Sequence, residues 1–203
     1  MNIGWMVSKG RFARTRMPCN RKLVWTNQSP TTLKRETIRL VSEGEREGEM
    51  KIGIIVYSRT GHTLSVAMKL KEKLSIAGHT VTLERLETAG PVSLSATSAE
   101  LKTMPAIDTY EALVFGCPVQ GGVPAPPMMS YLEQVASLEG KQVACLVTGF
   151  FPAGWGRNQT VAHMREICES RGATVCGAGS VGWFSLRRKR QISKVVDRLS
   201  ALF

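Results

Sequence analysis

The sequence lacks several features that would assign it to common classes of protein. It has no apolar run that approaches membrane-spanning length, so we expect no membrane partner. It has only three histidines, none with a neighbour at ligand spacing, which disfavours a metal site. Aromatic residues are few and do not alternate with the basic ones, which disfavours a platform for single-stranded nucleic acid.

Closely spaced cysteine pairs are also absent. The five cysteines are Cys19, Cys117, Cys145, Cys168 and Cys176, an odd number with no two-residue-spaced pair. We therefore expect mostly buried, reduced thiols and a cytoplasmic protein.

Acidic residues are scarce relative to basic ones. The chain has 27 Lys and Arg against 16 Asp and Glu, a formal net charge of +11. This balance predicts attraction to anions, whether nucleotides, acidic partner proteins or nucleic acid.

The first 49 residues differ from the rest. Residues 1–35 contain basic residues but no acid, residues 36–49 then turn acidic, and neither half keeps a helical or alternating apolar period. We predict a disordered basic extension over 1–49 and one domain over 50–203, beginning at Met50. The extension is explained either by upstream sequence translated from an early start assignment or by an organelle transit peptide.

From Met50 onward, strand patterns alternate with helix patterns, which predicts an α/β domain with a parallel sheet and helices on both faces. Strands are expected over 51–57, 80–86, 112–116, 142–148 and 174–181, and helices over 66–77, 126–136, 161–168 and 192–202. The connection 87–109 requires a crossover helix, for which only 98–104 has a helical pattern.

The most informative segment joins the first expected strand to the first expected helix. It contains Ser58, Thr60 and Thr63 around Gly61, so its hydroxyls and the amides of the first helical turn can all point at one anion. No Walker lysine follows the glycine, and the glycine spacing of a dinucleotide fingerprint is absent. The segment, called here the hydroxyl loop (residues 58–63), suits one terminal phosphate held mainly by neutral donors.

This segment resembles the N-terminal signature of the flavodoxin family. The matching positions are Ser58, Gly61, Thr63, Ala67 and Leu70, whereas Val56 stands where the family usually has an aromatic residue. The resemblance covers residues 50–203 in order and implies a flavodoxin-like three-layer sandwich with a five-stranded parallel sheet in the order 2-1-3-4-5. It also implies a short-chain member of the family that binds FMN.

Ligands of open parallel sheets bind outside the carboxyl ends of the strands, where three loops of this chain fall. By the resemblance, the first loop holds the phosphate of FMN, and the loops after the third and fourth strands border its ring system. The implied phosphate residues are Ser58, Arg59, Thr60, Gly61, His62 and Thr63, and the implied ring residues are Pro118, Val119, Gln120, Gly121, Thr148, Gly149, Phe150, Phe151 and Trp155.

Several of these side chains have a second interpretation. Phe150, Phe151 and Trp155 could pack in the core, Arg59 could point to solvent, and His62 could contribute its backbone rather than a proton. Cys117 is predicted to be a packed thiol rather than a redox-active one. The run 187–190, four consecutive cations, is either a solvated face or a docking patch for an acidic partner or nucleotide phosphates.

Three functions fit these observations. The first is an FMN-binding redox protein that exchanges electrons with a partner protein. The second is an NAD(P)H-dependent quinone or flavin-type oxidoreductase of the flavodoxin-like group, acting on a small acceptor. The basic charge favours the second, and the short chain favours the first. The third is a flavin-free interaction module on the same fold.

Overall fold

The computed structural model describes residues 48–93, 95–150 and 156–203. Residues 1–47 of the extension expected over 1–49 lie outside the described residues, so this extension remains a prediction. The elements follow one another in the order β1 (Lys51–Val56), α1 (His62–Ile76), β2 (Thr80–Arg85), β3 (Ala112–Gln120), β4 (Val123–Pro124), α2 (Pro126–Gln134), β5 (Gln142–Gly149), α3 (Arg157–Ser170), β6 (Thr174–Gly182) and α4 (Arg188–Ser200).

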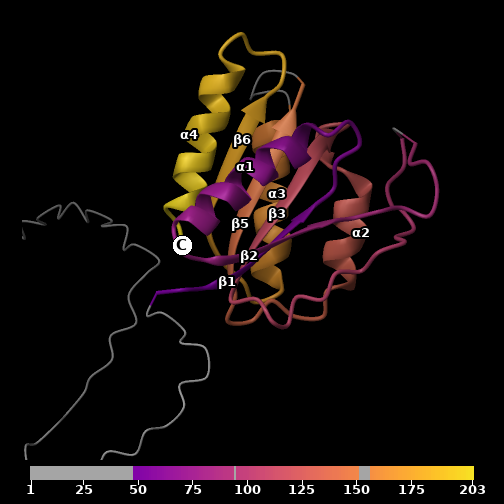
Figure 1. Cartoon of the computed structure of the whole chain (residues 1–203). Coiled ribbons are helices and arrows are strands. Elements are labelled where there is room, and N and C mark those ends of the chain that lie inside the picture. Colours follow the sequence, from indigo (N-terminus) through magenta and orange to yellow (C-terminus); the bar gives the residue numbers. More distant parts are fainter. Residues whose placement is uncertain (1–47, 94, 151–155) are drawn as a thin grey trace, which may run out of the picture.

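Five strands form a parallel sheet in the order β2-β1-β3-β5-β6 (Figure 1). Counted along the chain, these five strands have the order 2-1-3-4-5, which confirms the expected fold class. The two-residue strand β4 lies off this path and pairs antiparallel with the end of β3.

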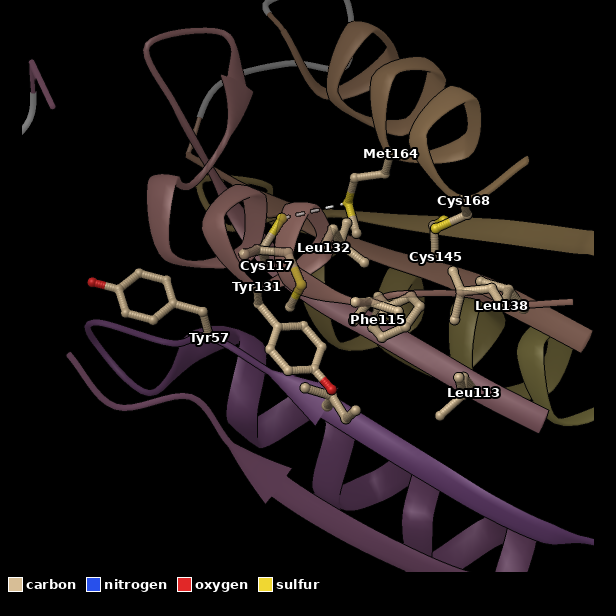
Figure 2. Close-up of a cluster of buried hydrophobic side chains, with 14 of the residues drawn as sticks. Tyr57, Leu113, Phe115, Cys117, Tyr131, Leu132, Leu138, Cys145, Met164 and Cys168 are labelled. Atoms are coloured by element: carbon tan, nitrogen blue, oxygen red, sulfur yellow. Dashed lines mark hydrogen bonds between the residues drawn. The ribbon is translucent and has the colours of Figure 1, made fainter. Parts of the chain in front are cut away.

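Helices cover both faces of the sheet (Figure 1). On one face, α1 and α4 pack on β1, β3, β5 and β6, and on the other face, α2 and α3 pack on β1, β3 and β5. Figure 2 shows part of the second core, in which Phe115 of β3 lies near Tyr131 of α2 with ring centroids 6.2 Å apart. The near-continuous apolar runs of β1, β3 and β5 are therefore explained by burial on both sides.

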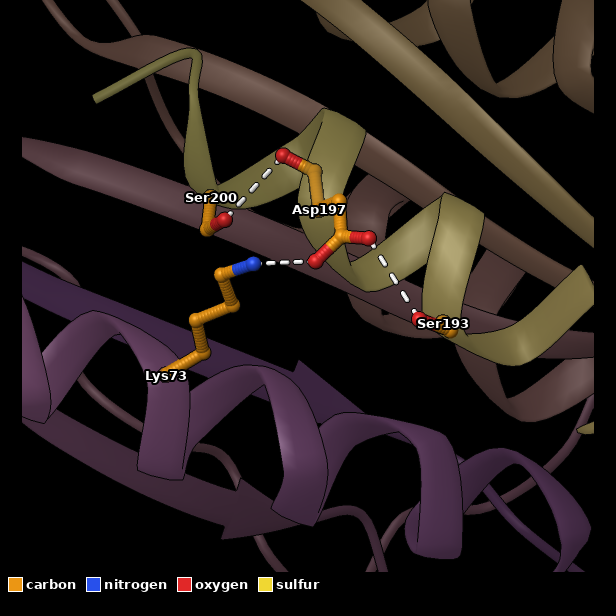
Figure 3. Close-up of polar contacts among 4 residues, drawn as sticks. All are labelled: Lys73, Ser193, Asp197 and Ser200. Atoms are coloured by element: carbon orange, nitrogen blue, oxygen red, sulfur yellow. Dashed lines mark hydrogen bonds and ion pairs between the residues drawn. The ribbon is translucent and has the colours of Figure 1, made fainter. Parts of the chain in front are cut away.

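Helices α1 and α4 are also joined at the surface (Figure 3). Nζ of Lys73 donates to Oδ1 of Asp197, whose Oδ2 accepts a hydrogen bond from Ser193 Oγ at 3.3 Å. Lys73 lies in the last turn of α1, at the end opposite the loop that precedes this helix, so the ion pair contributes to the packing of α1 and α4.

The crossover between β2 and β3 differs from the prediction. The helix expected over 98–104 is absent, and this segment instead forms an antiparallel bridge between Thr88 and Leu101. Its polar groups bond to α2, because Ala99 N donates to Ser130 Oγ at 3.0 Å and Tyr131 Oη donates to Pro105 O at 2.7 Å. The prediction was wrong because this backbone is bonded outside the segment: besides the bond to Ser130, Ala89 N donates to Glu100 O at 3.0 Å and Lys102 N donates to Glu87 O at 2.8 Å.

The other elements lie within a few residues of their predicted positions. Strand β3 continues to Gln120 instead of ending at Gly116, and α2 ends at Gln134, so Val135 and Ala136 lie outside the helix. Among the helices of the described ranges, none combines the length and the apolar character that crossing a membrane requires.

Candidate functional site

The carboxyl ends of β1, β3 and β5 surround a cavity of about 390 Å³, called here the edge cavity. It is lined by Ser58, Arg59, Thr60, His62, Thr63, Pro118, Val119, Gln120, Gly121, Thr148, Gly149, Phe150 and Trp183. Parallel strands bring their carboxyl ends to one edge, so three loops distant in sequence meet there.

The hydroxyl loop forms the wall of the edge cavity that follows β1. Gly61 is the N-cap of α1 and has a φ of 79°, in the left-handed region that favours glycine. Ser58 is buried, and its Oγ accepts a hydrogen bond from Leu64 N at 3.3 Å. This arrangement places hydroxyl groups and the backbone N–H groups at the start of α1 on one wall, where both can bind an anion.

Thr63 joins this wall to the sheet. Its Oγ1 lies 2.7 Å from Oγ1 of Thr148, the penultimate residue of β5, and both side chains are buried. One of the two hydroxyls donates to the other. The hydrogen bond therefore holds the first turn of α1 against the strand whose end borders the opposite side of the edge cavity.

The second wall is the hairpin from β3 to β4. Gly121 and Gly122 turn the chain with φ of 62° and 89°, so only glycine forms this turn without strain. The amide Nε2 of Gln120 donates to Ser93 O at 2.8 Å, which attaches the hairpin to the β2–β3 crossover. This wall thus consists of backbone and the side chains of Pro118, Val119 and Gln120, and the bond from Gln120 to the crossover fixes its position.

The edge cavity brings together twelve of the fifteen residues named from the sequence. Gly61 does not line the cavity but shapes the loop that does. Phe151 and Trp155 lie outside the described residues, so their assignment to the ring remains a prediction. Phe150 is 55% exposed, which contradicts the alternative that it packs in the core.

Trp183 is a lining residue that the sequence interpretation missed. Its ring stacks on that of His62, with centroids 3.8 Å apart and an interplanar angle of 19°. The guanidinium of Arg188 also lies over the Trp183 ring, with its Cζ 4.7 Å from the ring centroid. Trp183 directly follows β6. Because parallel strands end at one edge of a sheet, its position in the sequence could have identified it as a candidate site residue.

The environment of His62 favours the neutral form of its ring. Burial, and secondarily the positive charge of Arg188, lower the pKa of His62 below its ordinary value. A neutral imidazole offers one donor and one acceptor without charge. The stack on Trp183 therefore gives the side chain of His62 a defined position at the edge cavity, beyond the backbone role that the sequence favoured.

Arg157, the first residue of α3, is a buried cation behind the wall formed by Gly149. Its side chain is 6% exposed, its Nε has no hydrogen-bond partner, and burial lowers its pKa. A Cβ at Gly149 would lie 2.7 Å from its Cγ, and one at Gly182 would lie 3.0 Å from its Nη1. The two glycines thus leave room for this cation, whose charge favours an anion in the edge cavity.

Three cysteines of the described ranges lie in the core beside the sheet. Cys117, Cys145 and Cys168 are buried free thiols, and Cys117 Sγ donates to Met164 Sδ at 3.5 Å (Figure 2). Burial raises the pKa of Cys117 to about 12, which supports the packed thiol. Cys176, a residue of β6, is partly buried. Within the described ranges, no three His, Cys, Asp or Glu side chains gather as metal ligands would.

No family model matches the chain. Among curated proteins, it is 26% identical over 139 residues to "NAD(P)H dehydrogenase (quinone) 3" of Rhizobium meliloti, covering 63% of this chain and 66% of that protein. It is 27% identical over 95 residues to "NAD(P)H dehydrogenase (quinone)" of Acidovorax ebreus, covering 43% and 48% of the two chains. The chain thus spans just under two thirds of the first relative and about half of the second.

Solved structures resemble the chain more completely. A flavodoxin, WrbA-like protein from Agrobacterium tumefaciens superimposes with a TM-score of 0.58 at 16% identity, covering 75% of this chain and 96% of that one. A flavoprotein in complex with FMN from Lactobacillus acidophilus superimposes with a TM-score of 0.51 at 20% identity, covering 72% and 98%. The protein therefore has a flavodoxin-like fold.

Proposed function

We propose that this protein is a redox flavoprotein that holds FMN non-covalently in the edge cavity and transfers electrons through it. The observation that carries the proposal is the meeting of the hydroxyl loop, the β3–β4 hairpin and the end of β5 around one cavity. Its volume of about 390 Å³ lies in the range of small-molecule sites.

The hydroxyl loop fits a phosphate. A Cβ at Gly61 would meet nothing within 4 Å, so the backbone is open on that side. Ser58, Thr60 and Thr63 supply neutral donors, and exposed Arg59 lines the same wall. A dianion bound this way sits at the positive end of the α1 dipole, and the hydroxyl loop itself contributes no buried cation to it.

The opposite part of the edge cavity fits a flat ring. It is bordered by Pro118, Val119 and Gly121 on the hairpin and by Gly149 and Phe150 after β5. Glycines let backbone amides meet a ring edge, and an exposed aromatic side chain offers a face to cover it. Phe150 and Trp183 are the described aromatic residues at this cavity.

When bound, FMN would supply the redox chemistry, and the chain would supply binding, orientation and charge. His62 would present its imidazole at the wall of the edge cavity, stacked on Trp183. The buried cation Arg157 would favour negative charge on the bound ring and so raise its reduction potential.

A second candidate function is an NAD(P)H-dependent quinone or flavin-type oxidoreductase. The similarity to two curated NAD(P)H dehydrogenases favours it, as does the net charge of +11. The fold alone does not separate an electron carrier from such an enzyme, because both are built on the same sheet and edge.

The decisive experiment is an anaerobic visible spectrum of the full chain after reconstitution with FMN, before and after addition of NADPH. Retention of FMN through gel filtration is expected. Loss of the flavin band on addition of NADPH would support the oxidoreductase. A bound flavin that responds to dithionite but not to NADPH or NADH would support the carrier.

Failure of the chain to retain FMN would overturn both candidates in favour of a flavin-free module. Ser58→Ala combined with Thr60→Ala is the matched variant, because it removes two loop hydroxyls without touching the hydrogen bond between Thr63 and Thr148. It should weaken FMN binding while leaving the far-UV spectrum unchanged.

A further inference from the structure

A second cavity lies beside the edge cavity, at the junction of β6 and α4. It has a volume of about 730 Å³ and is lined by Trp183, Phe184, Ser185, Leu186, Arg187, Arg188, Lys189 and Arg190. We call it the basic cavity. Trp183 lines both cavities, so they share a wall.

The charge of the basic cavity is uncompensated. Its lining contains four cations and no acid, and none of the four takes part in an ion pair within the described part of the chain. They surround the N-terminus of α4, where the helix dipole disfavours cations. Helix stability therefore does not explain them, whereas an anionic ligand would.

Apolar side chains stand beside these cations. Phe184 and Leu186 are 78% and 106% exposed, although large apolar side chains are normally covered. The ring of Phe184 lies 5.4 Å from that of Phe150, which lines the edge cavity. The basic cavity thus offers apolar faces for a base next to cations for phosphates.

The arrangement His62–Trp183–Arg188 connects the two cavities. The Trp183 ring stacks on that of His62 and also contacts the guanidinium of Arg188, whose Nη1 donates to Trp183 O at 3.5 Å. Arg188 is thereby fixed, whereas Arg187, Lys189 and Arg190 are exposed. The three exposed cations can reach a ligand without losing a contact.

We propose that the basic cavity binds the adenine and phosphate end of NADPH, with the nicotinamide end reaching the edge cavity. Two cavities that share one wall match a ligand with a ring at one end and phosphates at the other. The cations surround a concavity that also has apolar faces, which suits a nucleotide better than the broad face of an acidic protein. The assignment of the nicotinamide end rests on the function proposed above.

The first test uses a ligand without a nicotinamide ring. Adenosine 2′,5′-bisphosphate is titrated calorimetrically into the full chain without FMN, with 5′-AMP as the comparison. We expect the bisphosphate to bind more tightly. Arg187→Ala combined with Arg190→Ala should raise its Kd about tenfold, since each exposed ion pair contributes modestly.

The matched control is Lys194→Ala combined with Arg198→Ala, which removes two exposed cations from the same helix outside the basic cavity. It should change Kd less than twofold. An equal loss in both double variants would overturn the proposal in favour of a general charge effect. Absence of binding at millimolar bisphosphate, together with binding of a polyglutamate peptide, would overturn it in favour of an acidic protein partner.

A separate titration with FMN keeps the two proposals distinguishable. Retention of FMN without binding of the bisphosphate would overturn only the nucleotide assignment. Binding of the bisphosphate by a chain that does not retain FMN would support the basic cavity as a nucleotide site and overturn the flavoprotein.

Discussion

Two strand-to-helix junctions at the same edge of the sheet differ in how they can hold an anion. The hydroxyl loop after β1 is compact, with buried Ser58 and Thr63 and neutral donors. The junction after β6 is open, with exposed cations and exposed apolar side chains. A compact neutral site binds through fitted hydrogen bonds, whereas an open charged site binds through attractions that salt screens.

The largest expected effect comes from the turn of the compact junction. Gly61→Val forces a β-branched residue into a left-handed conformation and should destabilise the protein by about 2 kcal/mol and weaken FMN binding. Urea unfolding measures the first effect and FMN titration the second. Gly61→Asn is the control, because asparagine tolerates this conformation better. Equal losses in the two variants would contradict the role assigned to the backbone angle.

The next effect tests the hydrogen bond that braces the hydroxyl loop. Thr148→Val leaves a buried hydroxyl of Thr63 without its partner and should cost about 1–2 kcal/mol of unfolding free energy. In a double-mutant cycle with Thr63→Val, the double variant should lose less unfolding free energy than the sum of the losses in the two single variants. Strict additivity would show that the hydroxyls do not act as a pair.

Salt dependence compares the two junctions directly. Between 50 and 300 mM NaCl, the Kd of adenosine 2′,5′-bisphosphate should rise severalfold, because exposed charges are screened. The Kd of FMN should change less, because neutral donors hold its phosphate. Equal salt slopes in calorimetric titrations would remove the distinction between the junctions.

A smaller effect concerns His62. Its folded-state pKa lies below its ordinary value of 6.5, so the unfolded chain takes up the proton more readily. Its contribution to stability is full above pH 6.5 and decreases as the pH falls through that value toward the lower folded-state pKa. The melting temperature of the wild type should therefore decrease more between pH 7.5 and 5.5 than that of His62→Gln. The same decrease in both proteins would contradict the assignment.

The smallest effect is expected far from both junctions. Lys73→Ala removes the exposed ion pair with Asp197 that joins α1 to α4 (Figure 3). It should cost less than about 1 kcal/mol in urea unfolding and leave ligand binding unchanged. A larger loss of unfolding free energy, or weaker ligand binding, would contradict the minor role given to this ion pair.

Most of the lining of the edge cavity could be named from the sequence because the relevant signals are local. A strand followed by Ser58, Gly61 and Thr63 forms its turn from its own residues, and buried strands such as β3 and β5 carry continuous apolar runs. The crossover after β2 could not be predicted in this way. Its hydrogen-bond partners Ser130 and Tyr131 lie in α2, about thirty residues away.

By itself, the sequence determined the order of strands and helices, the turn at Gly61 and the excess of positive charge, since these depend on neighbouring residues and composition. Only the tertiary structure decided that Thr63 bonds to Thr148 across 85 residues and that Trp183 stacks on His62. It also placed the cations of 187–190 beside the edge cavity. The physical reason is that a parallel sheet brings the ends of distant strands to one edge, so contacts there are set by strand order.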